Sequence, residues 1–369
     1  MRKLGRFGSL AAIALVIVVL GAACSSKKGT SGSNGGFSGV PLTGAGATFP
    51  KPIYDKWFHD FNSVESGAQI NYQAIGSGGG VEQFTAGTVD FGASDAPLKD
   101  EEIAAIKSNG RDVVQTPTVL GGVVIAYNVS GLESGLKLDG QTAADMFLGK
   151  ITTWNDPAIA QQNSGVTLPA EPIQIVHRSD ESGTTKVFTS WLSKGSPEWE
   201  SKVGADKAVP WPIGTGGDGN DGVAAGITQT EGAVGYLSYD FAVTSGLGVA
   251  QIKRDDGQYV APSVDSISAA GGILQFPISP DTNILNSPAA GAYPISTTTY
   301  LLINPQWTDK NKGQTMVDLL YWALTKGQDE TKAVNYSPLP DSIRQQALSL
   351  LSQIQYQGQT IQPSPAVKS

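Results

Sequence analysis

The chain has 369 residues, of which 16% are charged, with 45 glycines and 21 prolines. This length predicts two domains with cores of their own, and the chain is too rich in apolar and aromatic residues to be disordered. Three of its 25 basic residues, Arg2, Lys3 and Arg6, lie in a leader without acids. The 33 acids and 22 bases that remain form no basic stripe, which excludes a nucleic acid as partner.

The first 23 residues are predicted to be a signal peptide. Residues 1–6 are basic, and residues 7–23 form an apolar run that ends in small residues. This run is at the lower limit for a membrane-spanning helix, and no second apolar stretch of that length follows. Residues 24–40 are dominated by Ser, Gly and Lys, which predicts a flexible tether.

The single cysteine, Cys24, lies directly at the inferred cleavage point. The segment resembles a bacterial lipoprotein signal, in which this cysteine is lipidated and becomes the mature N-terminus. It departs from that pattern because Leu20 lies one position too far from Cys24, with Gly21 in its place, and cleavage by ordinary signal peptidase is the alternative. We expect lipidation, and therefore an exported protein anchored to the outer face of the cytoplasmic membrane. A lone cysteine also means that no internal disulfide forms.

Beyond the tether, hydrophobic periodicity predicts helices that alternate with strands. Apolar residues at helical spacing indicate an amphipathic helix over 51–62 and another that ends near residue 354, with Asp341 or Ser342 as its N-cap. Alternating or β-branched runs predict strands over 69–75, 119–127, 173–176 and 300–303. The polar, Pro-containing end, 359–369, is expected to fray. This alternation indicates α/β lobes.

Three segments rich in glycine and hydroxyl groups are candidates for a binding site. The first, LTGAGATFP at 42–50, combines Gly44 and Gly46, which allow close backbone approach to a ligand, with the Thr48 hydroxyl just before a helix. The second, IGSGGGV at 75–81, also lies between a strand and a helix and offers Ser77 beside a nest of N–H groups. Helix N-termini attract anions, but a Gly-rich turn before a helix is more often a simple connection.

Two aspartates, Asp90 and Asp95, follow in DFGASDAP at 90–97. Beside small residues they are compatible with a turn, a metal site or a proton acceptor. A metal ion needs further ligands, and the chain has two histidines, so we expect no metal.

The third segment, VHRSDESGTTK at 176–186, begins where a buried strand ends. Arg178 lies where open α/β sheets bind ligands, and its guanidinium offers a forked pair of donors to an oxyanion. Asp180 is placed to hold that fork, and a surface ion pair is the alternative. Ser-Gly-Thr at 182–184 opens the next helix and so forms another anion-binding terminus.

The sequence matches nucleotide-binding and catalytic motifs less well than it matches an anion-binding site. GTGGDG at 214–219 lacks the lysine and hydroxyl of the Walker pattern, and GASDA at 92–96 lacks the final glycine of a nucleophile elbow. His177 as a base for Ser182 is disfavoured, because neighbours in sequence at a strand end seldom face one another. We therefore predict a binding protein and not an enzyme.

Taken together and in this order, these segments resemble the phosphate-binding receptors of bacterial phosphate ABC importers. The likeness runs from residue 42 to SPLPD at 337–341, with shared stretches VDFGASDAP at 89–97, GGVV at 121–124, WPIG at 211–214, GNDG at 219–222 and YPIS at 293–296. The resemblance implies a bilobal periplasmic-binding-protein fold of type II, in which two α/β lobes are joined by two hinge strands and the ligand lies in the cleft. Residues 41–119 and 292–369 then form the first lobe, and residues 120–291 form the second.

The resemblance also implies a set of phosphate-binding residues from both lobes. They are Thr48, Phe49 through its N–H, Ser77 and Asp95 in the first lobe, and Arg178, Ser182, Gly183 through its N–H and Thr184 in the second. Asp180 matches the residue that orients the arginine, while His177 and Glu181 replace residues common in relatives. The implied partners are inorganic phosphate and the transmembrane permease subunits, and no cofactor is implied.

Asp95 is the residue expected to select phosphate. An ionised carboxylate can only accept hydrogen bonds, and phosphate keeps a proton at neutral pH whereas sulfate has none. Sulfate would leave this bond unmade and add a repulsion, a penalty of several kcal/mol by order of magnitude. The expected function is high-affinity extracytoplasmic phosphate capture for a permease. The alternatives are a receptor for arsenate, sulfate or another tetrahedral oxyanion, a non-transport phosphate sensor or adhesin on the same scaffold, and a phosphatase of similar fold.

Overall fold

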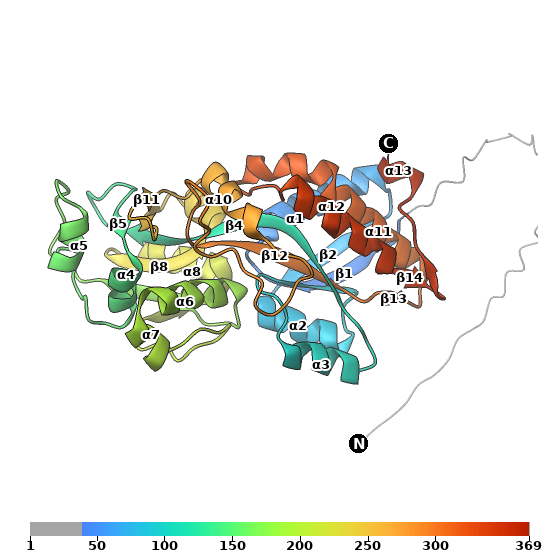
Figure 1. Cartoon of the computed structure of the whole chain (residues 1–369), viewed down its shortest axis with the longest axis horizontal. Coiled ribbons are helices and arrows are strands. Elements are labelled where there is room, and N and C mark those ends of the chain that lie inside the picture. Colours follow the sequence, from blue (N-terminus) through green and yellow to red (C-terminus); the bar gives the residue numbers. More distant parts are fainter. Residues whose placement is uncertain (1–38, 369) are drawn as a thin grey trace, which may run out of the picture. The chain divides into compact units, whose positions relative to one another are not determined.

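The computed structural model describes residues 39–368, and within them one sheet of nine strands is joined across its middle by the long strand β4 (Figure 1). Residues 114–122 of β4 pair with β12, and residues 123–128 pair with β8. In spatial order the strands are β2 (Ile70–Ala74), β1 (Leu42–Gly46), β3 (Phe91–Ser94), β12 (Ser296–Ile303), β4 (Val114–Asn128), β8 (Ala233–Ser238), β6 (Gln174–Arg178) and β7 (Thr215–Gly217), with β9 (Gly248–Val249) paired to β4. We call β2, β1, β3 and β12 the β1 half of the sheet, and β8, β6 and β7 the β6 half.

In the β1 half, strand β1 runs parallel to β2 and β3, and helices cover both faces. On one face the ring of Phe91 stacks on Tyr72 at 6.2 Å and meets Phe58 of α1 at 6.1 Å. On the other face Gly92 leaves room for Phe84 of α2, since a methyl group there would lie 3.0 Å from the Phe84 side chain. The helices of this half are α1 (Lys51–Val64), α2 (Ser77–Ala86), α3 (Asp100–Ser108), α11 (Lys310–Leu324), α12 (Asp341–Ser349) and α13 (Pro365–Lys368).

In the β6 half, strand β6 runs parallel to β7 and β8 and is covered in the same way. Phe188 of α6 stacks on Tyr236 of β8 at 4.4 Å, and Gly226 allows α8 to approach Val176 from the opposite face. The helices here are α4 (Gly140–Phe147), α5 (Pro157–Gln162), α6 (Gly183–Gly195), α7 (Pro197–Lys202), α8 (Gly219–Gln229), α9 (Tyr239–Thr244) and α10 (Val264–Ala270).

Smaller elements complete the described part of the chain. Two short sheets contain β5 (Lys137–Leu138), β10 (Gln251–Lys253) and β11 (Tyr259–Val260), and β13 (Gln306–Trp307), β14 (Gln355–Tyr356) and β15 (Gln359–Thr360). Short 3-10 helices span Gly271–Ile273, Lys326–Val334 and Leu350–Gln353. Among residues 39–368, no helix has the length and hydropathy needed to cross a membrane.

Two predictions at the C-terminal end are wrong. Residues 359–368 do not fray: Ile361 and Val367 are buried, and Ser364 donates hydrogen bonds to Asp318 (2.6 Å) and Glu65 (3.0 Å). Helix α12 begins at Asp341 itself, with Pro340 as its N-cap.

The α/β fold class is confirmed, and each predicted strand and helix has its counterpart in the sheet or on it. The predicted signal peptide and Cys24 lie outside the described residues, as does most of the tether. The lobe boundaries stay a prediction.

Candidate functional site

The predicted site residues lie in loops at the carboxyl ends of parallel strands. Strand β1 leads to residues 48–49, β2 leads to Ser77 at the start of α2, and β3 leads to Asp95. Strand β6 ends at Arg178, and the next turn leads to residues 182–184 at the start of α6. Parallel strands bring their carboxyl ends to one edge of a sheet, where open α/β sheets bind ligands.

The loops of the two sheet halves meet directly. A methyl group on Gly183 would lie 2.6 Å from Ser77 Oγ and 2.7 Å from Asp95 Cβ, so the start of α6 is pressed against the β1 half. The N–H of Gly78 on α2 donates to the carbonyl of Glu181 at 2.9 Å. The six side chains predicted to bind are at most 5% exposed, namely Thr48, Ser77, Asp95, Arg178, Ser182 and Thr184. The structure therefore brings the predicted residues together in one buried place.

Arg178 is oriented by the partly buried carboxylate of Asp180. Its Nε donates to Asp180 Oδ1 at 2.7 Å and its Nη2 donates to Asp180 Oδ2, and its side chain is 1% exposed. Asp180 Oδ1 also accepts from the N–H of Gly219 at 3.2 Å. The alternative of a surface ion pair is thus wrong. The remaining nitrogen, Nη1, is buried without a partner among the described residues, so the fixed fork keeps one nitrogen for an acceptor.

Asp95, in the β1 half, is the hydrogen-bond acceptor among the predicted site residues. Its Oδ1 accepts from Thr299 Oγ1 at 3.0 Å on β12, and the carboxylate is 2% exposed. Burial raises the pKa of Asp95 to about 7, while the hydrogen bond from Thr299 and the charge of Arg178 act in the opposite direction. At neutral pH this carboxyl group is therefore poised to share a proton with a neighbouring oxygen.

The hydroxyl groups of the site already accept hydrogen bonds from the protein. Ser77 Oγ accepts from a backbone N–H of its own sheet half (3.2 Å), and Ser182 Oγ, the N-cap of α6, accepts from an N–H in the first turn of that helix (3.2 Å). Thr48 Oγ1 accepts from Asn220 of the β6 half. Each hydroxyl has one proton, which remains available to a ligand. Thr184 Oγ1 is buried without a partner among the described residues.

This chemistry fits a protonated oxyanion better than a metal ion. Hydroxyl groups, an arginine and the N-terminus of α6 all donate, and Asp95 accepts. Within residues 39–368, no group of three or more His, Cys, Asp or Glu side chains is placed to hold a metal ion.

The two glycines of the first segment have a packing role. A methyl group on Gly44 would lie 2.2 Å from the ring of Phe91, and one on Gly46 would lie 2.1 Å from the carbonyl of Ala93. Gly46 also has a φ of +150°, which disfavours other residues. Both glycines therefore permit close packing around β1, and the expected backbone approach to a ligand stays a prediction.

Several supporting residues are not among the predicted site residues. Asn220 contacts Thr48, Thr299 holds Asp95, the Tyr236 hydroxyl accepts from the N–H of Arg178 (3.1 Å), and the Tyr336 hydroxyl donates to the carbonyl of Phe49. Asn220 lies in GNDG at 219–222, one of the stretches that carry the resemblance, so the sequence could have indicated it as a site residue. Thr299 and Tyr336 lie outside those stretches.

The serine-nucleophile alternative is not supported by the geometry. The ring of His177 stacks on Trp211 at 4.9 Å, and its Nδ1 lies 3.0 Å from the carbonyl of Arg178. Ser182 is occupied as the cap of its helix. His177 is thus engaged with Trp211 and not with Ser182.

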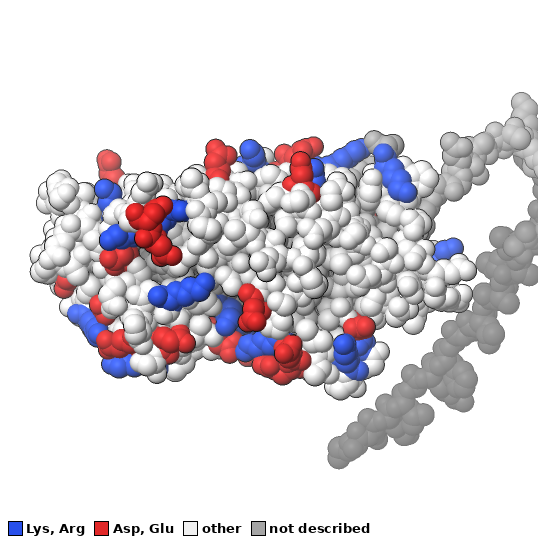
Figure 2. All heavy atoms as spheres, viewed as in Figure 1, with Lys and Arg blue, Asp and Glu red and all other residues white. Residues whose placement is uncertain are grey.

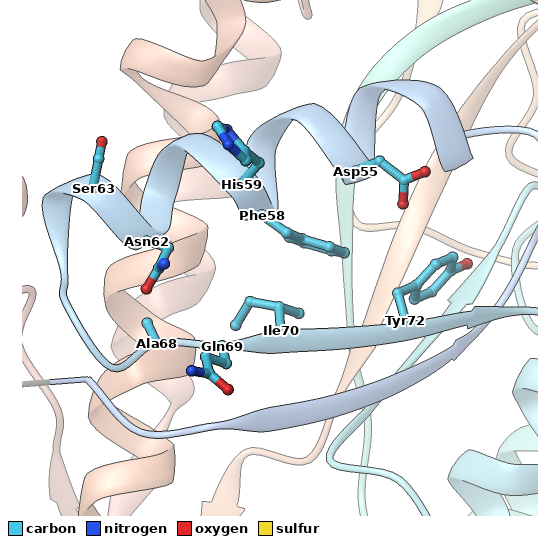
Figure 3. Close-up of a pocket in the computed structure, with 9 residues that line it drawn as sticks. All are labelled: Asp55, Phe58, His59, Asn62, Ser63, Ala68, Gln69, Ile70 and Tyr72. Atoms are coloured by element: carbon cyan, nitrogen blue, oxygen red, sulfur yellow. The ribbon is translucent and has the colours of Figure 1, made fainter.

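The described part of the chain also has hollows outside the loops that carry the predicted site residues. A pocket of about 490 Å³ between α1 and β2 is lined by residues such as Asp55, His59 and Tyr72, and it includes none of the predicted site residues (Figure 3). A cavity of about 440 Å³ opens beside Asp95 and is flanked by Lys186 and Lys194. On the face drawn in Figure 2, basic and acidic side chains lie in small mixed groups without a broad basic field.

Comparisons with known proteins agree with this geometry. Residues 25–335 match the model of the PBP superfamily domain. The chain is 40% identical over 310 residues to the phosphate-binding protein PstS of Xylella fastidiosa, which covers 83% of this chain and 84% of that protein. It is 40% identical over 307 residues to PstS of Pasteurella multocida, with 82% and 88% covered. The solved structure of a phosphate-binding protein from Stenotrophomonas maltophilia has the same fold, with a TM-score of 0.66 and 20% identity over 84% of this chain and 93% of that one.

Proposed function

The chain belongs to the PstS family of phosphate-binding proteins, and we propose that it captures inorganic phosphate outside the cytoplasm and delivers it to the permease of a phosphate ABC importer. The observation that carries the proposal is the close packing of the start of α6 against Asp95, with Arg178 buried at the end of the preceding strand and its charge acting on the Asp95 carboxyl group. Arg178 Nη1 is free to donate to any oxyanion. Asp95 accepts the proton that phosphate retains and sulfate lacks.

Each predicted residue has a role in the proposed complex. The donors are the hydroxyl groups of Thr48, Ser77, Ser182 and Thr184, the N–H groups of Phe49 and Gly183, and the guanidinium of Arg178. Asp95 is the acceptor, and Asp180 orients Arg178. The overall negative charge of the chain does not oppose this, because affinity comes from short-range donors in a dry site of low dielectric constant.

Capture involves closure of two lobes in this proposal. The lobes are residues 41–119 with 292–369, and residues 120–291, and the hinge strands are β4 and β12. The change of pairing partner within β4 lies three residues beyond this boundary, because residues up to 122 pair with β12 and residues from 123 pair with β8, which is compatible with a hinge in β4. The described arrangement corresponds to the closed form, and phosphate shifts the population towards it.

Ion pairs across the two halves support the same model of closure. Lys99 Nζ lies 2.8 Å from Asp206 Oδ2, and Lys207, whose side chain is 6% exposed, pairs with Glu102. Each pair joins the start of α3 in the β1 half to the loop after α7 in the β6 half. The Lys207 carbonyl also accepts from the N–H of Ser182 at 2.9 Å, which links this junction to the phosphate site.

The proposed location follows from the sequence before residue 40. A signal peptide exports the chain, and lipid on Cys24 holds it at the outer face of the cytoplasmic membrane. The protein binds phosphate without converting it, in keeping with relatives that are named as phosphate-binding proteins.

The test is a calorimetric titration of purified, phosphate-stripped protein with phosphate and with sulfate. We expect tight phosphate binding, sulfate binding weaker by at least about 100-fold, and no release of product from a chromogenic phosphate ester. Equal affinity for both anions would contradict the role of Asp95, and ester hydrolysis would indicate a phosphatase.

A further inference from the structure

The loop between β7 and α8 reaches from the β6 half to the side chain of Thr48. Asn220 is fully buried, and its Nδ2 donates to Thr48 Oγ1 at 2.8 Å. The backbone N–H of Asn220 donates to the same oxygen at 3.2 Å. Gly219 precedes it with a φ of +66°, and a methyl group at that position would lie 3.2 Å from Thr48 Cγ2. The turn therefore needs glycine for its conformation and stands close against Thr48.

These two contacts determine what the Thr48 hydroxyl can do. A hydroxyl group has one proton and two acceptor lone pairs. The two N–H groups of Asn220 occupy the acceptor positions of Thr48 Oγ1, so the hydroxyl proton has to point to a third partner. Thr48 is 5% exposed, so that partner is not bulk water.

The orientation of the Asn220 amide is also determined. Its Oδ1 accepts from the backbone N–H of Ser238 at 2.9 Å, where β8 ends. A flipped amide would bring its NH₂ group against the N–H of Ser238 and leave both groups without an acceptor. The NH₂ group therefore has to face Thr48.

We propose that Asn220 is a positioning residue that makes Thr48 a hydrogen-bond donor to phosphate when the two sheet halves meet. The proposal rests on the proposed function, capture of phosphate. Ser77 and Ser182 receive their hydrogen bonds from their own sheet half, whereas Thr48 receives both from the opposite half. The Thr48 hydroxyl is thus oriented by closure itself, which adds one donor to the site at the moment the ligand is enclosed.

The substitution Asn220→Asp tests this directly because it is isosteric. It keeps Oδ1 for the N–H of Ser238, so the structural role of the side chain is retained. It replaces the amide donor by a carboxylate, and Thr48 then donates to that carboxylate, which turns its proton away from the ligand. The Thr48→Val variant removes the hydroxyl altogether and serves as the second background.

We expect Asn220→Asp to raise the Kd for inorganic phosphate by about 100-fold when Thr48 is present and by less than about 10-fold in Thr48→Val. Equal factors in both backgrounds would overturn the proposal, because the new charge would then act on phosphate without Thr48. Unchanged affinity in Asn220→Asp would overturn it as well. The control Asp221→Asn changes the charge at the next, exposed residue and should leave the Kd within about 2-fold.

Stability and function are separated by two further measurements. Urea unfolding without phosphate measures how far the buried carboxylate lowers the midpoint of Asn220→Asp, and Kd values are compared under conditions in which both proteins are folded. If that variant fails to fold, Asn220→Ala takes its place in the same double-mutant cycle. Thr48→Val should then raise the Kd for phosphate by a smaller factor in Asn220→Ala than in wild type, and equal factors would overturn the proposal. Failure of the wild type to bind phosphate would instead reject the proposed function, so the two failures are distinguishable.

Discussion

Replacing Asp95 by Asn is the most direct test of how the site selects its ligand. Asn keeps the size of the side chain but adds an N–H donor, so an oxygen without a proton becomes acceptable. A hydrogen bond to a charged group contributes about 1.5–3 kcal/mol, so phosphate affinity should fall by about 10- to 100-fold. Sulfate affinity should rise at the same time, because the repulsion from the carboxylate is lost.

The free-energy cost of burying the charge of Asp95 follows from its pKa. Burial raises this pKa from 3.8 to about 7, and at 1.36 kcal/mol per pH unit the ionised carboxylate costs the closed, ligand-free site about 4 kcal/mol. The folded protein holds a proton that the unfolded chain releases, so its stability falls as pH rises from about 4 to about 7. Ligand-free Asp95→Asn should therefore exceed wild type in stability by up to about 4 kcal/mol above that window and match it below. Opening of the cleft reduces this difference.

The assay combines calorimetric titration with phosphate and sulfate and urea unfolding, at pH values on either side of 7. A protonated Asp95 donates a hydrogen bond, so wild type should bind sulfate more tightly as pH falls below about 7, whereas Asp95→Asn should not change. The comparison variant Thr299→Val keeps the carboxylate but removes the hydrogen bond that lowers its pKa, so the pH dependence of sulfate binding should persist and move to higher pH. An unchanged phosphate-to-sulfate ratio in Asp95→Asn would refute the selection mechanism, as would the same pH dependence of sulfate binding in both proteins.

Three further sets of substitutions test other parts of the structure. Arg178→Ala should raise the Kd for phosphate by at least about 100-fold and Ser77→Ala by about 10-fold, because the former removes a charged contact; equal losses in calorimetry would place Arg178 outside the site. Lys207→Met should weaken phosphate binding by about 10-fold, because it removes the ion-pair partner of Glu102 at the junction of the two halves. Adding Glu102→Gln should restore part of the lost affinity. If a titration followed by Trp fluorescence shows no restoration, the result counts against a role of this junction in closure. Glu65→Gln should flatten the pH dependence of stability. Burial and the neighbouring Asp318 raise the pKa of Glu65 to about 8, so wild type loses stability as pH rises from 4.5 towards that value. An unaltered pH dependence in urea unfolding would mean that Glu65 is not buried.

Local features of the site could be predicted from the sequence. Arg178 and Asp180 are two residues apart, and the ion pair between them forms within one turn after β6. Ser77 and Ser182 lie at predicted strand-to-helix turns, where they start or cap helices in the structure. Such features depend on few neighbours in sequence, so residue type and spacing are sufficient to find them.

Contacts that depend on sheet order or on closure could not be predicted in the same way. Thr299 reaches Asp95 because β12 returns antiparallel beside β3, and 204 residues separate the two in sequence. The C-terminal end was predicted to fray because it is polar, yet Ser364 is held by Glu65, 299 residues away, and by Asp318. Polarity alone cannot distinguish a frayed tail from one whose polar groups find buried partners.

In the proposed mechanism, closure and phosphate binding favour each other. In the closed arrangement Asp95 is buried at a cost of about 4 kcal/mol when ionised, and Arg178 Nη1 and Thr184 Oγ1 are buried without partners among the described residues. Each of these groups loses water on closure, so closure without a ligand is unfavourable. In the proposed complex phosphate brings a proton for Asp95 and acceptor oxygens for the other two groups, and it satisfies all of them at once. Sulfate would satisfy the donors but brings no proton for Asp95, so the proposed closed form discriminates between the two anions by the free energy of one missing proton.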